Sequence, residues 1–175
     1  QVARASKARR EFFRPRVEQL EDRRLLALIS VTGTGDAIAE DGLVTLREAI
    51  TSANFNFNIN ADVAGIGAYG TDTIAFNISG GGLQTISPII PLPMITDTVI
   101  IDGYTQPGSV PATAIASATI NVRLDGEFRS LSSGLLLGHT DNLSHSSSGS
   151  TIKGLMITRF GINSFGSGAG AGIQV

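Results

Sequence analysis

Two Asp-Gly pairs are the residues whose type and spacing most clearly suggest chemistry. Ile101-Asp102-Gly103 recurs as Leu124-Asp125-Gly126, 23 residues further along the chain. If both aspartates face one side of successive strands, they form a carboxylate pair of the kind that performs acid/base chemistry or binds Ca²⁺. Asp before Gly at a strand end is also ordinary turn chemistry, because Asp bonds the following backbone and Gly accepts positive φ. We favour the turn interpretation.

Three basic residues suggest a second kind of chemistry: Arg123, Lys153 and Arg159. On neighbouring strands they could bind or deprotonate an acidic sugar, as basic residues do in β-helical polysaccharide lyases. Isolated basic residues on strands are usually solvated, and no acidic metal cluster accompanies these three. We therefore expect no catalytic residue in this chain.

Metal and cofactor sites are not expected either. Four acidic residues are dispersed in predicted loops and match neither an EF-hand nor a nonapeptide calcium repeat: Asp36, Glu40, Asp41 and Asp62. His139 and His145 lie in a Ser/Gly-rich stretch, which favours loop positions over a metal centre. The chain has no cysteine, which excludes disulfides, thiolate metal sites and a cysteine nucleophile. Any calcium site would lie beyond Val175.

The segments 108–118 and 138–150, which are rich in Ser, Ala, Gly and Pro, are expected to be loops between strands. Glycine-rich segments at 80–82 and 166–170 are expected to be turns or flexible loops. A phosphate-binding loop would be followed by Lys and a helix, and neither segment is. We therefore predict no cofactor-binding residue.

The apolar residues predict the elements that would position these side chains. They form short Ile/Val/Leu runs in a chain with 21 Gly and no Trp, which favours short strands joined by turns. The runs recur near 74–76, 99–101, 120–124, 135–137, 152–157 and 173–175. Spacings near 20 residues are typical of stacked coils, and continuous apolar runs are typical of parallel strands. A β-sandwich, the rival architecture, predicts cleaner alternation and Asn-Gly hairpin turns, and neither is prominent.

A short helix is predicted after an opening strand at 28–32. Thr45 and Glu48 have the spacing of a capping box, in which each side chain bonds the backbone N–H of the other residue. Leu46, Ala49, Ile50 and Ala53 follow at three- and four-residue intervals and form one apolar face. We expect this helix to cover the open end of the strand stack. The predicted fold is therefore all-β, a right-handed parallel β-helix with a short N-terminal capping α-helix.

The segment Leu43-Val44-Thr45-Leu46-Arg47-Glu48-Ala49-Ile50-Thr51-Ser52-Ala53-Asn54 resembles the CSLREA segment that precedes β-helix domains in large secreted and surface proteins. Val44 and Thr45 stand where the family name has Cys and Ser, and Thr preserves the cap. The stretches 71–77, 91–96 and 99–108 are also similar to sequences that follow this segment, so the resemblance extends over roughly residues 43 to 160. It implies a β-helix, pectin-lyase-like fold.

Residues 1–27 differ in charge from the remainder. They hold eight of the 13 basic residues and four of the 15 acidic ones, so their net charge is +4 while that of residues 28–175 is −6. Such an acidic body disfavours nucleic-acid binding. Arg9-Arg10 partly matches a twin-arginine signal, but no adequate apolar region follows. The stretch 13–27 resembles the LEPR-XLL segment of exported bacterial proteins. Leu20-Glu21-Asp22-Arg23 has Asp22 in place of Pro, and Leu25-Leu26 is retained.

These observations predict two units, a targeting segment at 1–27 and the first coils of a β-helix at 28–175. The apparent strand at 171–175 ends without a terminating signal, so we expect a fragment that self-associates through its open end. No apolar run is long enough to span a membrane. We expect a non-enzymatic, exported stalk or adhesin-like surface protein with an extracellular glycan or cell-surface partner. The alternative is a carbohydrate-active enzyme whose active site lies beyond this segment.

Overall fold

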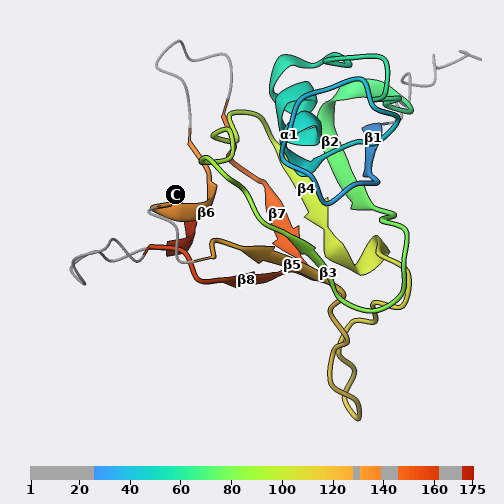
Figure 1. The fold of residues 1–175 in the computed structure, drawn as a ribbon, viewed down its shortest axis with the longest axis vertical. Helices are drawn as coiled ribbons and strands as arrows, with labels where there is room; N and C mark the ends of the chain where they lie inside the picture. Colours follow the sequence, from blue (N-terminus) through green and yellow to red (C-terminus); the bar gives the residue numbers. More distant parts are fainter. Residues whose placement is uncertain (1–25, 128–130, 139–145, 162–170) are drawn as a thin grey trace, which may run out of the picture.

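The computed structural model describes residues 26–127, 131–138, 146–161 and 171–175, so residues 1–25 of the predicted leader lie outside the description (Figure 1). The described residues form nine strands, one α-helix and one turn of 3-10 helix, η1 (Gly103–Thr105). All pairings between these strands are parallel. The parallel direction that the continuous apolar runs predict is therefore confirmed.

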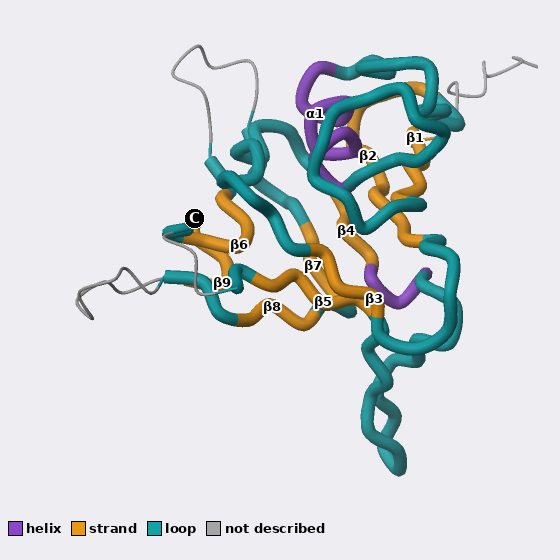
Figure 2. Tube along the Cα trace, in the orientation of Figure 1, coloured by secondary structure: helices purple, strands orange, loops and turns teal. Residues whose placement is uncertain are grey.

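The strands belong to three sheets, and from β3 onwards each strand lies in a different sheet from the strand before it (Figure 2). The four-stranded sheet has the order β1 (Leu26–Val31), β2 (Ala68–Phe76), β4 (Val99–Asp102) and β7 (Thr151–Lys153). The three-stranded sheet has the order β3 (Gln84–Ile86), β5 (Val122–Asp125) and β8 (Met156–Thr158). The third sheet pairs β6 (Ser133–Leu136) with β9 (Ala171–Gln174).

Aligned aliphatic residues run across each sheet and build the core. In the four-stranded sheet the register places four isoleucines in one row, Ile29, Ile74, Ile101 and Ile152. In the other sheets the equivalent rows are Ile86, Leu124 and Ile157, and Leu135 and Ile173. Most of these side chains belong to one buried cluster, and such burial is the main favourable term in folding. The rows explain why the sequence shows short, continuous apolar runs.

The helix α1 (Leu46–Phe55) forms where the capping box predicts it. Thr45 Oγ1 accepts from the backbone N–H of Glu48 at 3.2 Å, and Glu48 Oε2 accepts from the backbone N–H of Thr45 at 2.7 Å. The helix ends at Asn56, which adopts the left-handed conformation with φ 57°. Its apolar face enters the same core as β1 and β2, and Figure 1 shows the three elements side by side.

The prediction of an all-β right-handed parallel β-helix is wrong, because the structure is mixed α/β with parallel sheets and one helix. The physical reason lies in the segment between β1 and β2. Four apolar residues of α1 are buried in the cluster that the sheets share, so the helix is part of the core: Leu46, Ala49, Ile50 and Ala53.

Two details of the strand prediction also need correction. The run at 152–157 is two strands of different sheets, β7 and β8, separated by a turn at Gly154 with φ 68°. Strand β3 was not predicted, because Gln84-Thr85-Ile86 has no apolar run. The loop predicted at 108–118 is present. It forms an arm closed by antiparallel hydrogen bonds of 2.9 and 2.8 Å between Val110 and Thr119, and Figure 1 shows it extending away from the sheets.

Candidate functional site

Asp102 and Asp125 do not form a carboxylate pair, because they end strands of different sheets, β4 and β5. Each instead closes the turn that follows its strand. Asp102 Oδ1 accepts from the backbone N–H of Tyr104 at 3.0 Å, and Asp125 Oδ1 accepts from that of Glu127 at 2.9 Å. The turn interpretation is therefore confirmed.

Each of these aspartates also receives a basic side chain from the neighbouring strand. Lys153 Nζ lies 2.9 Å from Asp102 Oδ2, across the β4–β7 pairing. Arg159 follows β8 and donates to both oxygens of Asp125, through Nε at 2.6 Å and through Nη2. We call these two arrangements the corner ion pairs. They join consecutive strands of a sheet at the ends of those strands.

Asp125 is the more deeply buried of the two corner carboxylates, and its side chain has no exposed surface. The hydrogen bonds from Arg159 outweigh the effect of burial and lower the pKa of Asp125. The same bonds raise the pKa of Arg159. Asp125 is therefore held as a carboxylate, which suits an ion pair and does not suit a proton donor.

The three basic residues proposed for an acidic sugar are divided by the fold. Lys153 belongs to the four-stranded sheet, whereas Arg123 and Arg159 lie beside Asp125 in the three-stranded sheet. Arg123 Nε is 3.4 Å from Asp125 Oδ2, and Glu127 also acts on Arg159 electrostatically. Two carboxylates thus balance two guanidinium groups, which leaves little net positive charge to attract an anionic sugar.

Glycine at the corners is required by close backbone packing. A Cβ at Gly103 would lie 2.0 Å from the carbonyl oxygen of Gly154, and one at Gly126 would lie 2.5 Å from that of Arg159. Real Cβ atoms do not approach so closely. The Gly in each Asp-Gly pair therefore lets successive turns stack, while the Asp anchors the ion pair.

The dispersed acidic residues have structural roles. Asp62 Oδ2 accepts from the backbone N–H groups of Asp41 and Gly42 at 2.6 and 2.7 Å, and Asp36 forms an ion pair with Arg47. In the described ranges, no three or more His, Asp or Glu residues are grouped as a metal site would require. His139 and His145 lie outside those ranges.

One of the two glycine-rich segments lies in the described part of the chain, and the other does not. At 80–82, Gly80 and Gly82 have φ of 101° and 73°, and Gln84 Nε2 donates to the carbonyl of Gly81 at 3.3 Å. This segment is a turn, as predicted. The segment 166–170 is outside the described residues.

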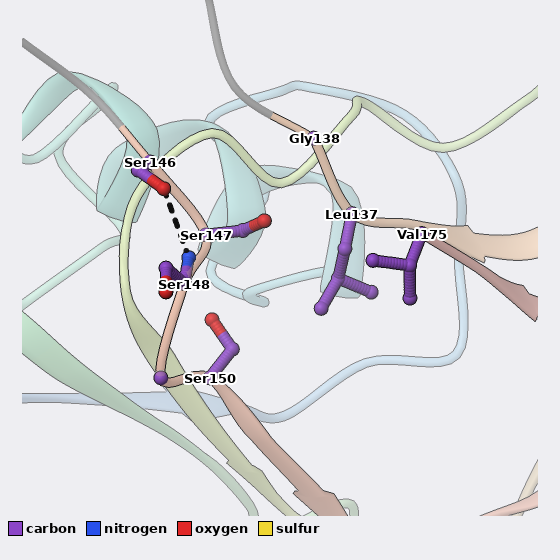
Figure 3. Close-up of a pocket in the computed structure, with 8 residues that line it drawn as sticks. Leu137, Gly138, Ser146, Ser147, Ser148, Ser150 and Val175 are labelled. Carbon is purple, nitrogen blue, oxygen red and sulfur yellow. Dashed lines mark hydrogen bonds between the residues drawn. The ribbon is translucent and has the colours of Figure 1, made fainter. Parts of the chain in front are cut away.

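A serine-lined pocket is the main feature that the sequence did not reveal. It has a volume of about 460 Å³ and is lined by Leu137, Gly138, Ser146, Ser147, Ser148, Gly149, Ser150 and Val175 (Figure 3). The sequence predicts only a loop at 138–150, because a run of serines has no periodicity. The one available signal is the run itself, Ser146-Ser147-Ser148-Gly149-Ser150, which places four hydroxyl groups on one short segment.

Hydrogen bonds fix the serine segment against β4. Val99 N–H donates to Ser150 Oγ at 3.1 Å, and Thr98 Oγ1 donates to the carbonyl of Ser148 at 2.9 Å. Ser146 Oγ accepts from the backbone of Ser148 at 3.1 Å, the bond drawn in Figure 3. The pocket therefore combines fixed polar groups with the aliphatic side chains of Leu137 and Val175, a lining that suits a neutral, polyhydroxylated ligand.

Comparisons with protein-family models, with curated proteins and with solved structures find no match to this chain. No helix in the described part of the chain has the length and apolar character that a membrane span needs.

Proposed function

We propose that this chain is a non-enzymatic scaffold of an exported or cell-surface protein, and that its serine-lined pocket binds a neutral glycan. The observation that supports this most strongly is the role of the residues that could do chemistry. The basic residues and the Asp-Gly carboxylates form the corner ion pairs, and Asp36 forms an ion pair with Arg47. These groups join segments of the fold to one another.

The proposal of export rests mainly on the predicted leader, residues 1–27. The resemblance of residues 13–27 to the LEPR-XLL segment, and of residues 43–54 to the CSLREA segment, supports secretion or surface display. The charge difference between the leader and the body agrees with a targeting role.

The neutral character of the glycan follows from the pocket lining. Serine hydroxyls both donate and accept hydrogen bonds, as sugar hydroxyls do, and the aliphatic side chains can contact the C–H faces of a sugar ring. An acidic glycan would need a cationic partner, and none of the described lining residues is cationic.

A glycan array that carries both neutral and uronic-acid oligosaccharides tests the binding proposal. We expect binding to neutral glycans, and we expect the pocket-filling variant Ser148→Leu to lose at least tenfold in affinity. Ser117→Leu is the matched control, because Ser117 is an exposed residue of the arm. Equal binding by both variants would contradict the pocket assignment, and release of unsaturated products from polyuronates would contradict the non-enzymatic assignment.

A separate experiment tests export. Protease shaving of intact cells, followed by mass spectrometry, should release peptides of residues 28–175. Recovery of these peptides only from the cytoplasm would contradict the proposed surface location.

A further inference from the structure

Asp72 is a buried carboxylate that lacks a full set of partners. The residue has no exposed surface, and Oδ1 accepts from the backbone N–H of Gly70 at 2.9 Å. Its other oxygen, Oδ2, is buried and has no hydrogen-bond partner among the described residues. A buried carboxylate lowers the stability of the folded protein unless it is paired, so Asp72 destabilises the fold as long as it has no partner.

The backbone nitrogen of Ala27 lies next to this carboxylate. Leu28 is opposite Thr73 in the β1–β2 pairing, and Ala27 and Asp72 are the residues that precede this pair, at the point where the register shifts. The Ala27 N–H is one of the two backbone amides that favour the charged form of Asp72. Ala27 is fully buried, like Asp72.

The exposed surface of the chain changes sharply between Leu26 and Ala27, the first two described residues of β1. Leu26 is 48% exposed, whereas Ala27 has no exposed surface. The register shifts between Leu26 and Leu28, so that Leu26 pairs with Ala68 and lies outside the continuous ladder. Among the described residues, Leu26 is therefore the first paired one, and Ala27 is the first one that the core encloses.

The groups around Asp72 disfavour its charge. Burial, and to a smaller extent the nearby carboxylate of Asp97, raise the pKa of Asp72 to about 6. Tyr69, on the same strand, has a raised pKa because of burial and because of Asp72. Within the described part of the chain no basic side chain contributes to the pKa of Asp72. A positively charged group at this position would stabilise the charged form of Asp72.

We propose that Asp72 is the acceptor for a new N-terminus at Ala27, made by hydrolysis of the Leu26–Ala27 peptide bond when the leader is removed. An endopeptidase adds water across this bond, which leaves a carboxylate on Leu26 and an α-ammonium group on Ala27. The ammonium then lies next to Asp72 and forms a buried ion pair with it. This inference rests on the proposed function, since it requires a leader that is cut from an exported chain.

The same geometry disfavours cleavage one residue later. A cut after Ala27 would place a small residue before the cleaved bond, as secretory cleavage prefers. It would also remove Ala27, so that no α-ammonium group would lie next to Asp72. The backbone of Leu28 is already engaged, because its N–H and C=O bond Ile66 at 2.8 and 3.1 Å. An α-ammonium group has an ordinary pKa near 8 and is charged at neutral pH, so only the cut before Ala27 supplies a cation directly at the carboxylate.

Mass spectrometry of the native protein, separated into surface and cytoplasmic fractions, is the first test. The expected N-terminal residue of the surface form is Ala27. A surface form that begins at Leu28, or that keeps the leader, would overturn this inference and leave the proposed function intact. A protein found only in the cytoplasm with its leader would overturn both.

The second test measures Asp72 itself. A site-specific protease sequence is placed so that cleavage of the folded or refolded full chain leaves Ala27 as the first residue, and urea unfolding is followed at pH 7. Asp72→Asn should raise the folding equilibrium constant of the uncut chain about tenfold, because it removes an unpaired charge, and should lower that of the cut chain about tenfold, because it removes the partner of the ammonium.

Asp41→Asn is the matched control, because Asp41 is exposed and Oδ1 accepts only the backbone N–H of Leu43 at 3.0 Å. Its effect should have the same sign and size in both chains. The same sign for Asp72→Asn in the cut and uncut chains would overturn the ion pair, whatever the stability of either chain.

Discussion

The guanidinium group of Arg47 donates hydrogen bonds to both carboxylate oxygens of Asp36. Arg47 Nη2 lies 2.8 Å from Oδ1 and 3.0 Å from Oδ2, and Nε lies 3.0 Å from Oδ1. The same guanidinium donates to the carbonyls of Ile90 and Pro91 at 2.9 and 3.0 Å. One buried side chain of α1 therefore fixes two loops that are distant in the sequence. The planar guanidinium group makes the bidentate hydrogen bonding to Asp36 possible.

Arg47→Met should lower the free energy of unfolding by about 3 to 5 kcal/mol, because it leaves the Asp36 carboxylate buried without its partner. The two side chains are only 9% and 8% exposed. Lys153→Met is the control: it removes an ion pair with a half-exposed lysine and should cost about 1 kcal/mol or less. Urea unfolding at pH 7 measures both, and equal losses would contradict the central role of Arg47.

Gly103→Ala should destabilise the fold by about 3 kcal/mol, because the added Cβ would meet the carbonyl oxygen of Gly154 at 2.0 Å and push two stacked turns apart. Gly81→Ala places its Cβ in open space and should change stability little. Thermal unfolding of the two variants separates the steric effect from the general effect of replacing glycine. A tolerated Gly103→Ala would show that the turns do not stack as described.

Asp72 should make the stability of the uncut chain depend on pH. Its pKa in the folded state is about 6, above the unfolded value of 3.8, so the folded state holds the proton more tightly. The free energy of unfolding should therefore fall as pH rises from about 4 to about 6 and stay level above that, by roughly 1 to 3 kcal/mol in all.

Two substitutions check this pH dependence by urea unfolding between pH 4 and 8. Asp72→Asn should remove this contribution. Asp97→Asn should move it to lower pH, because it removes a negative charge that raises the pKa of Asp72. An unchanged profile in Asp72→Asn would assign the dependence to another group.

Self-association should occur through the strands that end the three sheets, β7, β8 and β9. The aliphatic rows finish there on Ile152, Ile157 and Ile173, and Ile173 is 42% exposed. Ile173→Lys should abolish a concentration-dependent increase in sedimentation coefficient, since a charge on an edge strand opposes pairing. Ile115→Lys, on the exposed arm, should leave it unchanged. A monomer at every concentration would contradict the prediction.

The sequence predicted elements that depend on near neighbours better than contacts that depend on distant ones. The helix and its capping box were correct, because Thr45 and Glu48 are three residues apart and determine the helix start locally. Glu48 also accepts from Ala39 N–H at 2.9 Å and Asn60 Nδ2 at 2.6 Å, and no local pattern reveals these bonds.

Strand positions were largely predictable, whereas sheet membership was not. The 23-residue repeat of Asp102 and Asp125 suggested neighbouring strands, but parallel pairing depends on how the intervening chain turns, and the turns send β4 and β5 to different sheets. The pocket was missed for a similar reason. Its serines have no periodicity, and they become a binding surface only through their hydrogen bonds to Thr98 and Val99.

The arm closed by Val110 and Thr119 is a suitable place to insert a foreign peptide. Its two ends are already held together by a pair of backbone bonds, and Ile115 at its tip is 97% exposed. Because the entropic cost of a longer loop grows only slowly with length, an epitope or affinity tag inserted beside Ile115 should leave the sheets undisturbed. The protein engineer thus gains a display position on an exposed arm that extends away from the sheets (Figure 1).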